Sequence, residues 1–373
     1  MRINSVTVQR LSIPFRSPFI HASKARGRTE TVVLWITGSD GITGVGEILP
    51  RPYLTGETID SVSQSVRLIA QRWVGETFRS LNETIRALHA EFSETERALA
   101  TFAGWELAVL DLAGKSFNIA AGDVLGDAVK PDLQPGVVID FALPTKALEK
   151  HCILLRLRGQ RHIKVKVGRD DDLVRLQIVS QVFGKEFPLR LDANGIWTAD
   201  EAIRALRRMR GINIASIEQP VPAGDLTGMR RVRQETRIPV VADESVCSYR
   251  DAERVIDARA ADVFNVRLAK CGGFLGSLRL SKLAAASGFR CQLGTLVGET
   301  GILSAAAETF GRRLDCFDFL EGKGQSKRLL VEDVLEPSPS DDGAIRGLGI
   351  RVAANKITRW AASAATTYTA GRS

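Results

Sequence analysis

The sequence predicts an α/β protein in which a (β/α) barrel follows a smaller α+β unit. Three observations lead to this expectation. Strand and helix patterns alternate along residues 137–294, the strands end in polar residues about 25 positions apart, and the first 125 residues hold a hairpin followed by helices. Alternating strands and helices form parallel sheets, and enough such units close into a barrel.

The first unit is expected to consist of a strand, a hairpin and three helices. Residues 3–13 form the strand, and the patterns at 30–36 and 42–48 flank Gly38-Ser39-Asp40-Gly41, which is typical of a hairpin turn. Helical periodicity follows at 61–73, 81–92 and 94–117. We therefore predict an α+β domain over residues 1–125 that is completed by roughly 345–360, a barrel over 126–344, and a loose tail rich in Ala and Thr over 361–373.

The second unit repeats a strand and a helix. Its expected strands are 137–142, 162–167, 188–192, 215–219, 238–243, 263–268 and 290–294. Its expected helices are 173–183, 199–210, 249–258 and 275–286. Thr198-Ala199-Asp200-Glu201 has the form of a capping box that opens the second helix, and Gly211 indicates where this helix ends.

The composition is that of an ordinary globular protein, with 44% hydrophobic and 25% charged residues over 373 positions. No apolar run approaches the roughly 18 residues that span a bilayer, and the first 15 residues lack the apolar block of a signal peptide. We therefore expect a cytoplasmic protein without a membrane partner. Five cysteines without a Cys-x-x-Cys pair argue against a disulfide framework or a zinc cluster. The net charge of +8 favours anionic substrates, but the aromatic residues of a nucleic-acid site are missing, so no nucleic-acid partner is expected.

Polar residues follow the predicted strands at a regular step. The positions, 24 to 26 residues apart, are Lys166, Asp192, Glu218, Asp243, Arg267 and Gln292. Strand ends on one rim of a barrel converge on a single site, and three gathered carboxylates repel one another unless a cation compensates them. A helix cap or an arginine partner would explain any single acid, but three in phase favour a metal. Oxygen ligands suit a hard cation, so we predict that Asp192, Glu218 and Asp243 bind Mg²⁺, with Mn²⁺ as the alternative ion.

Two lysines precede the first of these acids. In His162-Ile163-Lys164-Val165-Lys166-Val167 the alternation places Lys164 and Lys166 on one face of the strand. Two lysines that point into a barrel are costly unless they are paired or used. Because neighbouring cations lower each other's proton affinity, one of the two is a credible base near neutral pH.

Together these motifs resemble the enolase superfamily, in the muconate-lactonizing subgroup of the mandelate racemase/muconate lactonizing enzyme family. The matching elements are Lys164-x-Lys166, Asp192-Ala193-Asn194, Ile217-Glu218-Gln219-Pro220, Ala242-Asp243-Glu244-Ser245, Lys270-Cys271-Gly272-Gly273 and the helix at 106–115. The resemblance covers nearly the whole chain. It implies a modified TIM barrel, (β/α)₇β, with an α+β capping domain, Mg²⁺ on the three acids, and Lys166 as the proton-transfer residue. Such sites combine a lysine or histidine base with Mg²⁺ that stabilises an enediolate. Lys164 would keep Lys166 partly neutral or help to hold the substrate carboxylate.

One position departs from the family's pattern. A second lysine usually lies across the site in this subgroup, but the matching residue here is Arg267, which is a poor base because it stays protonated. Lys270 is a secondary candidate for this role. We therefore predict a reaction that one lysine can serve, either muconate cycloisomerase-like isomerisation or syn elimination of water, with Arg267 as a fixed cation. A dipeptide epimerase or an N-acylamino acid racemase is the alternative.

Two further hypotheses belong to other classes of protein. The first is a barrel that keeps the fold for binding without catalysis, and the intact acids and Lys-x-Lys pair argue against it. The second is a barrel enzyme that handles phosphates, and the lack of a P-loop argues against that one.

Specificity is expected to depend on two loops over the barrel mouth, at 18–28 and 50–56, by analogy with the family. Both carry cationic and aromatic groups that suit an anionic, partly apolar ligand. The residues expected to contact substrate, from these loops and from strand ends, are Phe19, Tyr53, Asn194, Glu244, Thr295 and Glu321. Asp318 is the alternative acid near the eighth strand. The expected partner is a small anionic carboxylate, and the chain is expected to form a homo-oligomer.

Overall fold

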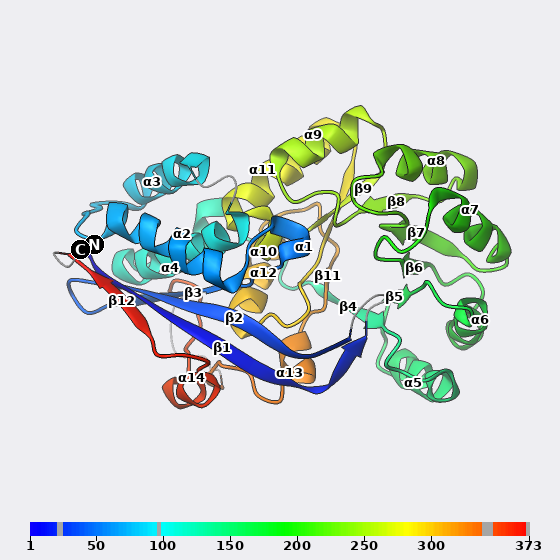
Figure 1. Ribbon diagram of the computed structural model, residues 1–373, viewed down its shortest axis with the longest axis horizontal. Coiled ribbons are helices and arrows are strands. Elements are labelled where there is room, and N and C mark those ends of the chain that lie inside the picture. Colours follow the sequence, from blue (N-terminus) through cyan, green and yellow to red (C-terminus); the bar gives the residue numbers. More distant parts are fainter. Residues whose placement is uncertain (21–24, 95–97, 338–345, 371–373) are drawn as a thin grey trace.

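The structure is a computed structural model that describes residues 1–20, 25–94, 98–337 and 346–370. Its two parts are a closed barrel of eight strands and an antiparallel sheet of four strands, which lie side by side along the long axis of the molecule (Figure 1). Neighbouring barrel strands pair in parallel. The predicted α/β class, barrel and capping domain are therefore confirmed.

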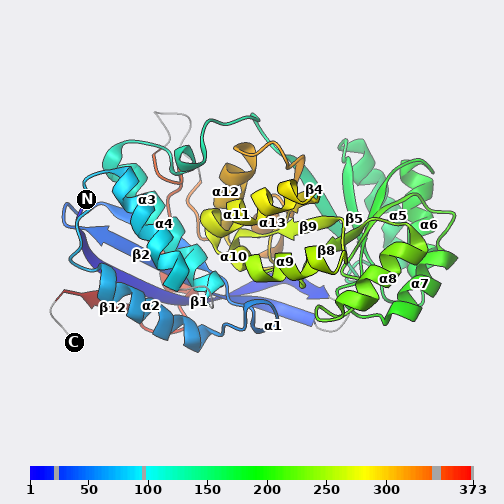
Figure 2. The same cartoon turned by 90° about the horizontal axis from the view of Figure 1, so that it is seen from above.

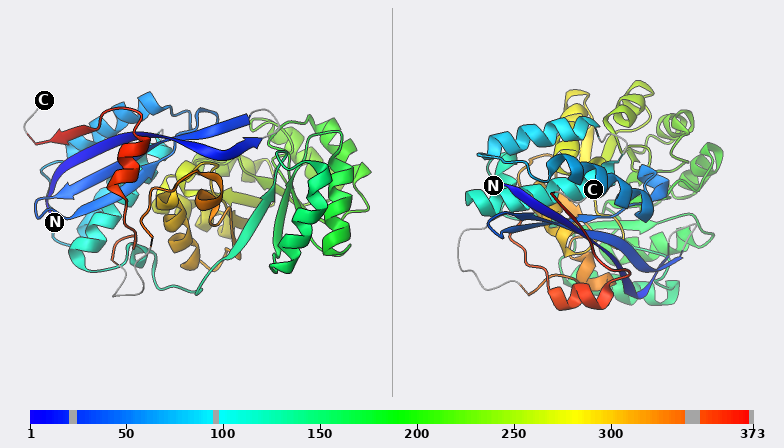
Figure 3. Two further views of the ribbon diagram at one scale, coloured as in Figure 1. Left: turned by 90° about the horizontal axis from the view of Figure 1, so that it is seen from below. Right: turned by 60° about the vertical axis from the view of Figure 1, so that its left-hand side comes forward.

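The capping domain combines the four-stranded sheet with helices from both ends of the chain. The sheet order is β12-β1-β2-β3. Its strands are β1 (Ile3–Ile20), β2 (Ala25–Gly38), β3 (Thr43–Ile48) and β12 (Thr366–Thr369). Its helices are α1 (Pro52–Thr55), α2 (Ile59–Trp73), α3 (Leu81–Glu94), α4 (Leu99–Phe117), the 3₁₀ helix η1 (Ala121–Leu125) and α14 (Ala354–Trp360). Strands β1 and β12, which come from opposite ends of the sequence, lie side by side in this domain (Figure 3).

Two expectations about this domain need correction. The first predicted loop, 18–28, is largely strand, because β1 and β2 stay paired as far as Ile20 and Ala25; residues 21–24 lie outside the described residues. The tail at 361–373 is not entirely loose, because Thr366–Thr369 pairs with β1, with Ser5 opposite Thr369. Its Thr-Thr-Tyr-Thr sequence consists of β-branched and aromatic residues, which favour strands.

The barrel closes in the order β10-β11-β4-β5-β6-β7-β8-β9. Its strands are β4 (Gln134–Ile139), β5 (His162–Lys166), β6 (Leu189–Asp192), β7 (Ile214–Glu218), β8 (Val240–Ala242), β9 (Val263–Val266), β10 (Arg290–Leu293) and β11 (Phe319–Glu321). Its helices, which surround the strands (Figure 2), are α5 (Thr145–Leu157), α6 (Asp172–Phe183), α7 (Ala199–Arg208), α8 (Leu226–Thr236), α9 (Tyr249–Asp257), α10 (Leu268–Cys271), α11 (Gly273–Ala286), α12 (Gly301–Arg312) and α13 (Gln325–Leu329). Among the described helices, none has the length and apolar character needed to cross a membrane.

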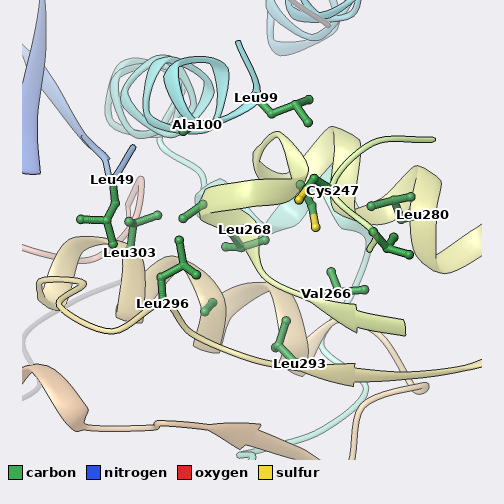
Figure 4. Close-up of a cluster of buried hydrophobic side chains, with 14 of the residues drawn as sticks. Leu49, Leu99, Ala100, Cys247, Val266, Leu268, Leu280, Leu293, Leu296 and Leu303 are labelled. Carbon is green, nitrogen blue, oxygen red and sulfur yellow. The ribbon is translucent and has the colours of Figure 1, made fainter. Parts of the chain in front are cut away.

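Helix α4 joins the two parts of the molecule. An added Cβ at Gly46 of β3 would lie 1.9 Å from the carbonyl oxygen of Gly104, so a glycine is required for the strand to pack this closely on α4. On the opposite side, Glu106 accepts the backbone N–H groups of Phe274 and Leu275 at the start of α11, at 2.5 and 2.9 Å. Apolar side chains from both parts also form one buried cluster (Figure 4), which includes Leu49, Leu99, Ala100, Val266, Leu268 and Leu293. The capping domain is therefore held firmly against the barrel.

Candidate active site

The three predicted metal ligands meet at one rim of the barrel. Asp192 and Glu218 are the last residues of β6 and β7 and pair in register, and Asp243 directly follows β8. All three are at most 1% exposed. The regular spacing in the sequence therefore brings these carboxylates together, because it places each one at the carboxyl end of a neighbouring strand.

Lys164 lies among carboxylates. Its Nζ is 2.9 Å from Oδ2 of Asp192 and 3.1 Å from Oε1 of Glu218, and it also forms an ion pair with Glu321. Burial disfavours the charged amine, but the three carboxylates outweigh burial and raise the pKa of Lys164. Lys164 is therefore a fixed ammonium group.

Lys166 lies two residues after Lys164 in β5, on the same face of the strand. Its Nζ is 2.6 Å from Oδ2 of Asp192 and 2.6 Å from Oδ1 of Asn194. The amines of Lys164 and Lys166 thus contact the same oxygen of Asp192, at 2.9 and 2.6 Å. Asn194 in turn donates to Oε1 of Glu244 at 3.1 Å, which fixes the amide that orients Lys166.

Arg267 and Lys270 have different surroundings. Nη2 of Arg267 lies 2.5 Å from Oδ2 of Asp243 and 3.3 Å from Oε1 of Glu218. Burial opposes the charge of this guanidinium, but these carboxylates raise the pKa of Arg267. Lys270 is fully buried and donates to the backbone oxygens of Asp243 and Val246 at 2.5 and 2.6 Å. Lys270 therefore supports the loop after β8, whereas Arg267 faces the site.

A cavity opens over these groups. It is lined by Lys164, Lys166 and Arg267 and by all six residues predicted to contact substrate, Phe19, Tyr53, Asn194, Glu244, Thr295 and Glu321. Asp318, the alternative acid, is largely exposed and faces Lys130 instead. Apolar side chains, among them Leu54, Val138 and Leu296, complete the wall. The cavity thus combines a cationic floor with apolar and aromatic walls.

Two contributors to the site were absent from the predictions. Arg190 of β6 pairs in register with Lys164 and donates to Glu321 at 2.6 Å. The alternation in Leu189-Arg190-Leu191-Asp192 places Arg190 on the same face as Asp192, so the signal used for the lysines would have found it. Gln219, with a φ of 38°, accepts the N–H of Asp243 at 3.1 Å and positions that acid; no pattern in the sequence indicates this role.

The acids fit a hard divalent cation in chemistry and position. They supply only oxygen donors, are buried, and lie at adjacent strand ends. Oδ1 of Asp243 accepts no hydrogen bond from the part of the chain that the structure describes, although Nζ of Lys270 lies 3.1 Å away. In this structure Lys164 forms ion pairs with both Asp192 and Glu218, and Arg267 forms ion pairs with both Glu218 and Asp243. Within the described residues, no group of three acidic, histidine or cysteine side chains is arranged so that it could hold a metal ion. A metal at this rim would take the place of those ion pairs.

The capped barrel with lysines and acids at the rim is the architecture of an enolase-superfamily enzyme. Residues 3–126 match the mandelate racemase / muconate lactonizing enzyme N-terminal domain, and residues 147–356 match the enolase C-terminal domain-like family. The chain belongs to the mandelate racemase/muconate lactonizing enzyme family.

Known proteins related to this chain include several isomerases. The L-Ala-D/L-Glu epimerase of Bacillus subtilis (strain 168) is 30% identical over 86% of this chain and 88% of its own length. The muconate lactonizing enzyme of Pseudomonas fluorescens, solved with muconolactone, is 26% identical with a TM-score of 0.85, over 96% of this chain and 99% of that one. The dipeptide epimerase of Enterococcus faecalis V583 shares the fold, at 24% identity and a TM-score of 0.83, over 94% and 99%. The chain is accordingly an enzyme of the isomerase type, which argues against the non-catalytic barrel.

Proposed function

We propose that this chain is a divalent-metal-dependent epimerase or racemase that moves the proton beside the carboxylate of an amino-acid derivative, such as a dipeptide or an N-acylamino acid. The observation that carries the proposal is the position of Lys166, which lines the cavity and whose amine contacts Asp192, one of the three buried acids at one rim. The epimerase activity named for the Bacillus subtilis relative supports the substrate class. It favours the alternative that we had ranked second, over muconate-like isomerisation or dehydration.

Asp192, Glu218 and Asp243 are the residues that would hold the metal, Mg²⁺ in the first place. The E. faecalis epimerase is complexed with Mg and a dipeptide. When bound, Mg²⁺ supplies concentrated positive charge that stabilises the enediolate oxygens of the substrate carboxylate.

The other steps, proton transfer and substrate binding, depend on side chains of this protein. Lys166 accepts the proton from carbon, and Asn194 holds its amine in place through the 2.6 Å contact. Lys164 keeps Glu321 as a carboxylate partner that favours its ammonium form, so it attracts the substrate carboxylate. Glu321, which contacts both Lys164 and Arg190, fixes the orientation of Lys164. The apolar wall accommodates the rest of the substrate.

Arg267 favours a second candidate function. Epimerisation requires proton transfer on both faces of the carbon, and the residue available across from Lys166 is a guanidinium paired with Asp243 and Glu218. A reaction served by Lys166 alone, either cycloisomerisation or syn elimination of water, needs only a fixed cation there. The two candidates make opposite predictions about stereochemistry.

Proton exchange in deuterated water with Mg²⁺ tests both candidates. We expect dipeptides or N-acylamino acids to take up deuterium and to appear as both stereoisomers. Lys166→Ala should lower this rate by at least about a hundredfold, the usual contribution of a positioned base. Lys185→Ala, at an exposed lysine remote from the site, is the matched control. Exchange with retention of configuration would instead support the one-lysine reaction, and exchange that survives Lys166→Ala would refute the role of Lys166.

A further inference from the structure

A second, strongly basic hollow lies in the capping domain, lined in part by the segments 18–28 and 50–56 but by none of the residues that line the catalytic cavity. It has a volume of about 580 Å³ and lies between the β1–β2 hairpin and the start of α1 and α2. Four arginines line it, Arg10, Arg26, Arg28 and Arg51. None of them belongs to the constellation of lysines and acids described above.

Nearby acids balance the positive charge of this hollow only in part. Among the described residues, the ion pair formed by these arginines is that of Arg10 with the exposed Asp60, at 3.4 Å. Glu30 also lines the hollow and, with Asp60, is one of two carboxylates there. The buried Glu47 and Glu299 also lie near Arg51, but burial raises the pKa of both acids and so disfavours their charged forms. Excess charge of one sign in a concave surface attracts ions of the opposite sign.

Arg51 differs from the other three arginines because it is buried. Only 6% of it is exposed, and its guanidinium donates to the carbonyls of Pro50 and Val297 at 2.9 Å each, with no carboxylate partner in the described part of the chain. Burial, together with the nearby charge of Arg26, lowers the pKa of Arg51 to about 10. The nearby Glu47 and Glu299 offset part of this effect on the pKa, but within the described residues neither forms an ion pair with Arg51. A buried guanidinium without a direct ion pair is costly, so a negative group bound in the hollow would stabilise it.

The backbone adds to the same field. Thr58 and Ile59, at the start of the 15-residue helix α2, line the hollow. The first turn of a helix carries partial positive charge and favours anions. Arginine forks match the oxygen geometry of phosphate better than other cations do.

We infer that this arginine hollow is a binding site for a small phosphate-type oxyanion, separate from the catalytic cavity. The two places are nevertheless connected. The guanidinium of Arg26 lies 5.4 Å from the ring centroid of Tyr53, and Arg51 donates to the carbonyl of Val297; both Tyr53 and Val297 line the catalytic cavity. An oxyanion bound in the hollow thus acts on two residues of the substrate-binding wall.

Titration calorimetry with inorganic phosphate, at constant ionic strength in chloride, tests this site on the full chain. We expect a Kd of about 1 mM or tighter. The double variant Arg10→Gln/Arg28→Gln should weaken binding about tenfold or more, the loss expected for at least one charge-assisted hydrogen bond. Arg28 is exposed, and the ion pair that Arg10 forms within the described residues is with exposed Asp60, so the variant should fold, which its thermal transition will show.

Two controls separate this site from others. Arg230→Gln, at an exposed arginine on α8, should leave phosphate binding unchanged. Lys166→Gln should also leave it unchanged, because the catalytic cavity is a different place. The inference is overturned if phosphate does not bind, if the double variant binds as the wild type does, if Lys166→Gln abolishes binding, or if succinate binds as tightly as phosphate.

Discussion

Replacing Glu321 by glutamine should destabilise the protein by about 3 kcal/mol near neutral pH. The side chain of Glu321 is 6% exposed, lies 2.6 Å from Nη1 of Arg190 and forms an ion pair with Lys164. Burial alone would raise its pKa, but Lys164 and Arg190 outweigh burial and lower the pKa from 4.5 to about 2. At about 1.4 kcal/mol per pH unit, this difference corresponds to roughly 3 kcal/mol.

The lowered pKa of Glu321 also predicts how its contribution to stability changes with pH. The folded pKa lies below the unfolded value, so the contribution is fully present above pH 4.5 and is lost as the pH falls toward about 2. Urea unfolding of wild type and Glu321→Gln in the presence of a chelator, near neutral pH and at about pH 3, measures both quantities. The difference in free energy of unfolding should shrink on acidification.

Glu235→Gln is the control for this experiment. Glu235 forms ion pairs with Arg207 and Arg231 at 3.0 and 2.8 Å, but its side chain is 34% exposed, and surface pairs contribute only about 0–1 kcal/mol. If Glu321→Gln costs no more than Glu235→Gln, or if its cost does not change with pH, the ion-pair network around Lys164 does not stabilise the barrel as we have argued.

Three further predictions concern metal, packing and a second buried acid. Mg²⁺ at about a hundred times its Kd should stabilise the wild type by about 2.7 kcal/mol in a thermal melt, and Asp243→Asn should lose this effect. Gly46→Ala, which places a Cβ 1.9 Å from a backbone oxygen, should lower the free energy of unfolding by about 1–3 kcal/mol, whereas Gly224→Ala, with open space around it, should not. Burial raises the pKa of Glu299 from 4.5 to about 8, so Glu299 alone should lower wild-type stability by up to about 1.4 kcal/mol per pH unit across that range, and Glu299→Gln should make the pH profile less steep by this amount. Equal slopes for wild type and variant would contradict the last prediction.

Most of the fold could be predicted because the periodicity of apolar residues and the helix-capping motifs indicate the same helices and strands. The capping box at Thr198 and Glu201 is present with both reciprocal hydrogen bonds, and the predicted strands 162–167, 188–192 and 290–294 match β5, β6 and β10 to within a residue or so. Helices α5, α8 and α12 were not predicted. In α5, Leu157 is 79% exposed, so apolar residues on the solvent side blur the helical period.

Only the site residues that lie at the ends of strands could be predicted from the sequence. Spacing located the acids and lysines, because one residue per strand end suffices for that. It could not show that Glu321 pairs with Lys164 or that Lys270 turns to backbone carbonyls, since these depend on side-chain direction. The arginine hollow was also missed, because it assembles residues from the hairpin and from the start of α2.

The capping sheet is built from opposite ends of the polypeptide, with Ser5 of β1 opposite Thr369 of β12. During synthesis the first strands leave the ribosome long before their edge partner exists, so the sheet is completed only after the entire barrel has emerged. Anyone who exchanges this cap between relatives must therefore transplant two separate gene segments. A circular permutant that places β12 directly before β1 would instead encode the cap as one continuous stretch, because these two strands pair with each other.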